Sequence, residues 1–139
     1  GGYDFDFGRV KMVQALHSGG MVTEDGNITY LGSPCGYVIE MEDITIYHAG
    51  DTGLFSDMSL ISEEFELDLA FLPIGDNYVM GPEDALKATT LLKPKGVIPM
   101  HYNTFPVIEQ SPEEFKTKVE EVAGTQCIIL EPGQEMDIT

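Results

Sequence analysis

In the first half of the chain, apolar residues occur in short runs separated by turn residues, which is the pattern of β-strands. Asp25-Gly26 favours a tight hairpin turn, and Glu42-Asp43 separates two further runs. The first half is therefore expected to be a β-meander. Its predicted strands are residues 9–16, 21–23, 28–31, 35–41 and 44–48.

Helical spacing of apolar residues appears only in the second half of the chain. Ser56 is a candidate cap for a short helix that buries Met58, Ile61 and Phe65. A second helix is expected over residues 82–92, since Pro82 suits a first turn and Pro94 stops the helix.

Ser111-Pro112-Glu113-Glu114 has the residues of a helix start: a cap, a proline in the first turn and a glutamate three residues after the cap. The apolar face of this third helix is expected to consist of Phe115, Val119 and Val122. The strands expected around the three helices are residues 67–73, 96–100 and 126–130, with a short final strand after Pro132-Gly133.

A β-meander followed by β-α-β-α-β predicts an α+β domain with a mixed sheet and helices on one face. The sequence has no internal repeat, low-complexity tract or linker, so residues 1–139 are interpreted as one continuous unit. At 139 residues, the chain is long enough for a hydrophobic core.

Composition and charge exclude several classes of function. Hydrophobic residues make up 42%, an ordinary globular value, and the longest apolar run, residues 67–74, contains Asp68 and is too short to span a membrane. The net charge is −17, with seven basic residues against 24 acidic ones, which argues against nucleic acid as a partner. Two isolated cysteines, Cys35 and Cys127, suit a reducing compartment. We therefore expect a cytoplasmic protein that acts on a small molecule, with neither a membrane nor a nucleic acid as a partner.

Three polar residues able to bind metal follow predicted strands. His17 comes after the first strand, Asp51 just after residues 44–48, and His101 directly after residues 96–100. Strand ends are where sheet enzymes commonly place functional side chains. His48, the remaining histidine, lies three residues before Asp51, and a lone histidine is more often packed than ligating.

The sequence around these residues resembles the metallo-β-lactamase superfamily. Residues 47–52, Tyr-His-Ala-Gly-Asp-Thr, contain its Gly-Asp-Thr motif, and residues 99–102, Pro-Met-His-Tyr, match its last histidine ligand. His17 stands where that superfamily has a lone histidine ligand. Residues 72–77, 80–85 and 101–106 resemble more closely a small prokaryotic family of metal-dependent hydrolases. The similarity runs over essentially the whole chain.

This resemblance implies a metal-dependent hydrolase with a dinuclear centre held by His17, Asp51 and His101. Asp51, with two carboxylate oxygens, would bridge the ions and is the expected catalytic residue. The ions are expected to be zinc, with Mn, Fe or Ni as alternatives. They would activate water against an ester-like bond in a lactone, an ester or a phosphodiester. The residues expected to support the ligands or contact substrate are His48, Thr52, Asp76 and Asn103, with the Thr52 hydroxyl bonded to the Asp51 carboxylate.

One departure from the superfamily is decisive for this interpretation. The motif His-x-His-x-Asp-His, which provides the other ligands, is absent from the sequence. The chain is therefore expected to be the C-terminal half of an αβ/βα sandwich, inactive without an N-terminal half that is cleaved but bound or a separate chain. Without that half, one sheet face would be bare, with apolar residues of 35–41, 44–47 and 67–72 meeting water, and a homo-oligomer is the fallback.

Two alternatives to the hydrolase remain at this point. The first is a non-catalytic module that keeps the fold but binds metal weakly or not at all, which the missing motif suggests. The second is a di-iron redox protein, because the resembled superfamily includes such members.

Overall fold

In residues 1–138, which the computed structural model describes, the chain folds around a seven-stranded mixed sheet. Strands β1, β2, β5 and β6 pair antiparallel, whereas β6, β7, β8 and β9 run parallel to one another. The predicted change from a meander to alternating strands and helices is thus confirmed. The strands in spatial order are β1 (Gly2–Phe5), β2 (Gly8–Gln14), β5 (Cys35–Glu40), β6 (Thr45–His48), β7 (Leu69–Pro73), β8 (Gly96–Met100) and β9 (Gln126–Cys127).

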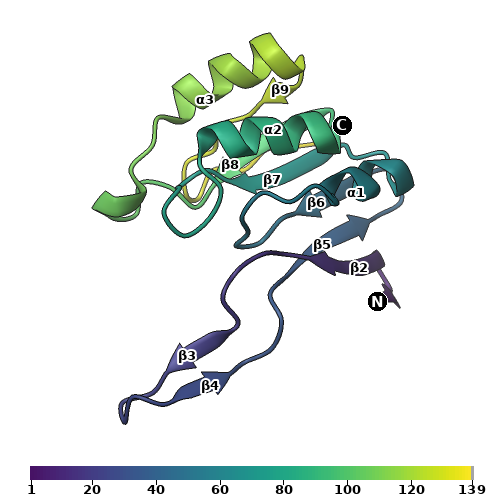
Figure 1. The fold of residues 1–139 in the computed structure, drawn as a ribbon. Helices are drawn as coiled ribbons and strands as arrows, with labels where there is room; N and C mark the ends of the chain where they lie inside the picture. Colours follow the sequence, from purple (N-terminus) through teal and green to yellow (C-terminus); the bar gives the residue numbers. More distant parts are fainter. Residues whose placement is uncertain (139) are drawn as a thin grey trace.

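The helices cover one face of this sheet, as the sequence predicts (Figure 1). Their side chains pack on strand residues such as Val38, Tyr47 and Leu72, which are fully buried. Ser111 Oγ accepts a hydrogen bond from the Glu114 N–H at 3.1 Å, so the predicted cap of α3 is confirmed. The helical segments are α1 (Met58–Glu64), α2 (Pro82–Leu92), the 3-10 turn η1 (Pro106–Ile108), α3 (Pro112–Lys118) and the π-helical turn η2 (Val119–Ala123).

Three local predictions were wrong. The cap of α1 is Asp57 rather than Ser56, and no side chain bonds the free N–H groups there. Val122 is 66% exposed because the last helix continues as a π-turn, whose wider winding rotates this residue off the apolar face. The C-terminal strands were overpredicted, because the strand expected over residues 126–130 is only two residues long and residues 132–138 form none of the short final strand expected after Pro132-Gly133.

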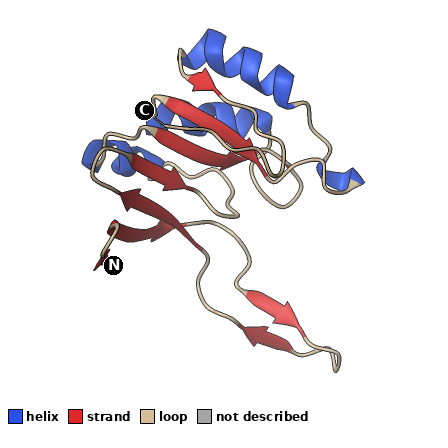
Figure 2. Ribbon diagram, turned by 180° about the vertical axis from the view of Figure 1, so that it is seen from behind, coloured by secondary structure: helices blue, strands red, loops and turns tan. Residues whose placement is uncertain are grey.

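Two short strands form an arm that projects from the body of the molecule (Figures 1 and 2). They are β3 (Gly20–Val22) and β4 (Ile28–Tyr30), joined by the predicted turn at Gly26, whose φ is +80°. We define the arm as residues 18–34. Its apolar side chains are more than half exposed, and its only charged residues are at its tip.

The face of the sheet opposite the helices is open over β1, β2 and β5. The strand register places Tyr3, Met12 and Tyr37 on this face, and they are 67%, 50% and 41% exposed. The predicted bare face is therefore present, and we call it the open face. The expectation for residues 67–72 was wrong, because Leu69 and Leu72 are buried. In the part of the chain that the structure describes, no helix is both long and apolar enough to cross a membrane.

Candidate functional site

The candidate residues gather at one edge of the sheet because of its strand directions. β2 is antiparallel to β5, which is antiparallel to β6, so β2 and β6 point the same way as β7 and β8. The carboxyl ends of these four strands therefore lie at a common edge. His17, Asp51, Asp76 and His101 each follow one of them.

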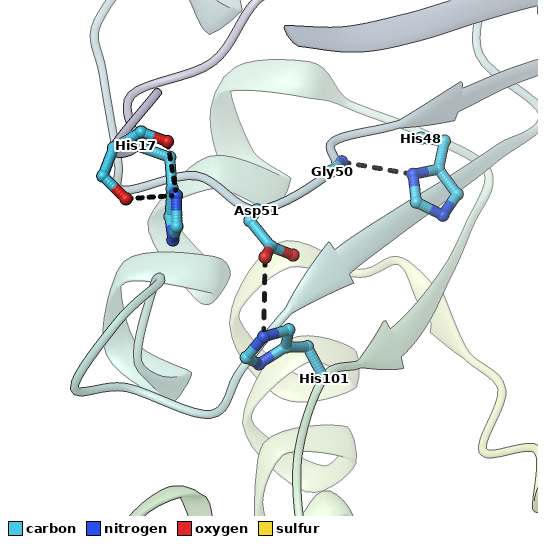
Figure 3. Close-up of polar contacts among 6 residues, drawn as sticks. His17, His48, Gly50, Asp51 and His101 are labelled. Atoms are coloured by element: carbon cyan, nitrogen blue, oxygen red, sulfur yellow. Dashed lines mark hydrogen bonds and ion pairs between the residues drawn. The ribbon is translucent and has the colours of Figure 1, made fainter. Parts of the chain in front are cut away.

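The Asp51 loop turns sharply at the end of β6. Gly50 has a φ of +65°, and a side chain there would approach the Cys35 carbonyl oxygen to 2.7 Å, so only glycine fits. The Gly50 N–H donates to His48 Nδ1 at 3.2 Å (Figure 3). This bond ties the turn to the last residue of β6. Asp51 itself stays half-exposed, with its carboxylate free to meet a ligand.

His101 faces Asp51 from the end of β8. Its Nε2 lies 3.7 Å from Asp51 Oδ2, and Figure 3 shows the carboxylate directed at the ring. The backbone of His101 is left-handed, with a φ of +56°, and it packs against Gly75, where a Cβ would come within 2.3 Å of the His101 carbonyl oxygen. His101 Nδ1 is buried and has no hydrogen-bond partner among the described residues.

Thr52 connects the end of β2 to the Asp51 loop. Its buried hydroxyl accepts from the Leu16 N–H at 2.9 Å and donates to the Gly53 carbonyl at 2.8 Å, while the Gly53 N–H donates to the Leu16 carbonyl at 2.9 Å. The predicted bond from Thr52 to the Asp51 carboxylate was wrong, because these backbone groups take the hydroxyl. Thr52 instead holds the segment that carries His17.

His17 lies near this edge but does not join the other two residues. Its Nδ1 is 3.3 Å from the Ser18 carbonyl oxygen and 3.4 Å from Ser18 Oγ, and its ring lies to one side of Asp51 (Figure 3). Within residues 1–138, no three His, Cys, Asp or Glu side chains gather closely enough to hold a metal ion. The structure therefore brings Asp51 and His101 together and leaves His17 apart.

The supporting residues have mainly local contacts. The His48 ring stacks on Phe71 with 5.6 Å between centroids, and burial lowers its pKa, against the opposing effect of Asp51. Asp76 is exposed in a left-handed turn, and its N–H donates to the Met80 carbonyl at 3.0 Å. Asn103 Oδ1 accepts from the Gln110 N–H at 2.8 Å and so closes the loop after His101.

A cavity of about 620 Å³ lies beside His101. It is bounded by the strand residues Phe71 and Ile98, the loop after β8 and the segment around Leu130. Gly75, whose close contact sets the position of His101, was not identified from the sequence. The sequence signal for Gly75 was weak, since a glycine after a strand also fits an ordinary turn.

The donors at this edge fit a metal ion in part. Asp51 Oδ2 and His101 Nε2 are too far apart for a hydrogen bond, and their 3.7 Å separation suits two ligands of one ion with bonds of about 2.1 Å. Imidazole and carboxylate together are typical ligands of Zn, Fe or Mn. Further donors are required to complete a coordination sphere of four or five.

Comparison with known proteins shows the family to which this chain is similar. A family model described as a beta-lactamase superfamily domain matches residues 1–101. The chain is 56% identical to a UPF0173 metal-dependent hydrolase of Pelotomaculum thermopropionicum over 134 residues, which is 96% of this chain and 59% of that protein. It is 54% identical to one of Geobacillus sp. over 138 residues, covering 99% and 60%.

A solved structure of a metallo hydrolase is similar to this chain in both fold and sequence. Igni18, a metallo hydrolase from the archaeon Ignicoccus hospitalis, superimposes with a TM-score of 0.82 and 40% identity over 96% of this chain and 56% of that chain. The sequence thus spans about 60% of the length of the curated relatives given above.

Proposed function

Because this chain belongs to the beta-lactamase superfamily, we propose that it forms the C-terminal half of a metal-dependent hydrolase whose two divalent ions, zinc by preference, are held in part by His17, Asp51 and His101. The observation that carries the proposal is the pair formed by Asp51 and His101 at the carboxyl edge of the sheet. The names of the relatives, metal-dependent hydrolases, support the same activity.

Each residue has a distinct part in the proposed reaction. Divalent ions, when bound, lower the pKa of a coordinated water and so supply hydroxide at neutral pH. Asp51 would hold the ions at the carboxyl edge of the sheet through its two carboxylate oxygens. His101, which follows β8, orients this carboxylate. His17 would complete this half of the ligand set once its ring leaves Ser18.

The remaining ligands come, in this proposal, from an N-terminal half that packs on the open face. That half would bring a second sheet and the histidine-rich motif to the same edge. Two features support this occupant: the open face carries exposed Tyr3, Met12 and Tyr37, and the relatives are longer than this chain. Apolar side chains gathered on one face stabilise such a contact by roughly 25 cal/mol per Å² buried.

The proposal is tested by Asp51→Ala in the intact enzyme that contains this chain. We expect kcat/KM for an ester to fall by roughly 10³-fold or more, because each lost interaction with metal-bound charge is worth several kcal/mol. The control is Asp57→Ala, an exposed aspartate beyond the site whose side chain accepts from the neighbouring Ser56 hydroxyl and bonds no N–H group of α1. Unchanged activity in Asp51→Ala, with a normal circular dichroism spectrum, excludes the proposed site.

Metal content gives a second test of the same site. His17→Ala and His101→Ala are each expected to weaken metal binding, as measured by competition with a chelator and elemental analysis. Two ions for each intact enzyme support a dinuclear centre. Stoichiometric iron with a visible absorption band would favour redox chemistry over hydrolysis.

A non-catalytic module is the second candidate. It is supported by the separation of His17 from Asp51 and His101 in residues 1–138. If the intact enzyme neither binds metal nor hydrolyses any ester, this candidate replaces the hydrolase.

A further inference from the structure

The shape of the arm is set by its own hydrogen bonds. At its tip, the Asp25 carboxylate accepts from the Thr23 hydroxyl at 2.5 Å and from Asn27 Nδ2 at 2.6 Å. At its base, the Leu31 N–H donates to the Gly19 carbonyl at 2.8 Å. A two-stranded hairpin with nothing packed on it is marginally stable at best in water. The strands of the arm are therefore expected to pack on another surface in the intact protein.

One broad side of the arm is apolar across both strands. The register places Val22 opposite Ile28 and Gly20 opposite Tyr30, so these four residues share one side. The three side chains are 69%, 78% and 73% exposed in the order Val22, Ile28 and Tyr30. The Tyr30 hydroxyl is hydrogen-bonded to Ser33 Oγ at 2.9 Å, so it needs no polar group from a partner. We call this surface the apolar side of the arm.

The arm is a surface separate from the open face of the seven-stranded sheet. It projects away from the body in both views (Figures 1 and 2). Its opposite side, with Met21, Thr29 and Leu31, is exposed as well. A second sheet packed on the open face extends over at most one of the two sides of the arm. The other side is left for a further partner, and only the apolar side lacks a polar strand residue such as Thr29.

The charge pattern favours a second copy of the chain as this partner. The chain carries a net charge of −17, but the only charged residues of the arm are Glu24 and Asp25, at its tip. The arm is thus a place where two acidic copies can touch without bringing carboxylates together. If the arms run antiparallel, each tip meets the uncharged base of the other arm. The bodies then stay roughly 20 Å apart at ~3.4 Å per residue, beyond the screening length of about 8 Å at physiological ionic strength.

The apolar side is also complementary to a copy of itself. An antiparallel two-fold contact brings the Tyr30 ring of each copy over the pair formed by Val22 and Ile28 of the other. Gly20, which has no side chain, leaves room beside the ring. Each of the three side chains exposes on the order of 100 Å² or more, so the contact buries roughly 1,000 Å² in all, near the lower limit for a specific interface. An area of this size is consistent with a micromolar dissociation constant.

We propose that the apolar side of the arm is a dimer contact, on which a second copy of the chain packs its own arm in an antiparallel, two-fold arrangement. The open face remains for the N-terminal half. The contact does not involve Asp51 or His101, so the inference is independent of the reaction and of the metal ions.

Sedimentation velocity of the intact enzyme, from about 1 to 100 μM, tests this contact. We expect a dimer that dissociates on dilution. Ile28→Glu should raise the dissociation constant by about 100-fold or more, because the symmetry buries two new carboxylates in an apolar contact. The matched control is Thr29→Glu, which adds the same charge to the next residue of β4 on the opposite side of the arm. It should change the dissociation constant by less than about threefold.

Val22→Glu repeats the test from β3, with circular dichroism to confirm that each variant is folded. A dimer that persists in both Ile28→Glu and Val22→Glu would overturn the proposal, as would equal disruption by Thr29→Glu. A wild-type enzyme that is monomeric at about 100 μM would overturn it as well. If that monomer has a lower melting temperature in Ile28→Glu and not in Thr29→Glu, the apolar side is covered by the N-terminal half of the same molecule instead.

Discussion

Replacing Thr52 with valine tests how the site is held together. The two side chains have nearly the same shape, so the change removes the hydroxyl and opens no cavity. It deletes the bonds of 2.9 Å from the Leu16 N–H and 2.8 Å to the Gly53 carbonyl, at a side chain with no exposed surface. A buried donor left without a partner costs about 1–3 kcal/mol, so the free energy of unfolding should fall by about that amount.

Urea unfolding of the intact enzyme, followed by circular dichroism, measures this loss. The matched control is Thr89→Val, because Thr89 is equally buried but its hydroxyl donates only to the Ala85 carbonyl, within its own helix. That change should cost under about 1 kcal/mol. Thr52→Val should also weaken metal binding, since Leu16 precedes His17. Equal losses in the two variants, with unchanged metal affinity, would refute the role given to Thr52.

Three further predictions concern Gly75, His48 and the open face. Gly75→Ala should reduce metal affinity and activity by about tenfold or more, because the new Cβ would displace His101, whereas Gly53→Ala, whose Cβ meets its nearest atom at 3.8 Å, should change little. Titration with zinc checks both, and equal affinities would argue against the contact with His101. His48→Ala should lower the free energy of unfolding by about 1 kcal/mol through the lost bond to Gly50, with metal content unchanged in elemental analysis. Loss of the metal in that variant would make His48 a ligand. The isolated 139-residue chain should self-associate at micromolar concentration in light scattering, and Met12→Glu on the open face should reduce this association. A cooperatively melting monomer would contradict the exposed face as a contact surface.

Local sequence signals predicted the helices and the central strands well. The bounds of α2 and β8 agree with the prediction, because Pro82 and Pro94 limit the helix through backbone chemistry and the apolar run 96–100 marks the strand. The ends of the chain were predicted less well. β1 depends on pairing with β2, and β9 is cut short after two residues, so both are decided by tertiary contacts that a single segment does not encode.

The order of the site residues along the chain was informative about their place in the sheet. Because His17, Asp51 and His101 each follow a strand, a common edge could be expected once the strands were paired in parallel. The distances between these three residues could not be predicted from the sequence. Whether His17 meets the other two depends on the arm that begins at Ser18, and the sequence gives no signal for the direction of that arm.

The arm leaves the sheet after β2 and returns to it at β5, and the two strand ends are neighbours because Gln14 pairs with Cys35. Everything from Ser18 to Pro34 is thus inserted between two fixed points that the antiparallel pairing already holds together. Doubling the length of such an insertion costs only about 0.6 kcal/mol of closure entropy. The arm is accordingly the place where homologous sequences can gain or lose residues, and where a tag or a foreign peptide can be grafted, while the strands on either side keep their register.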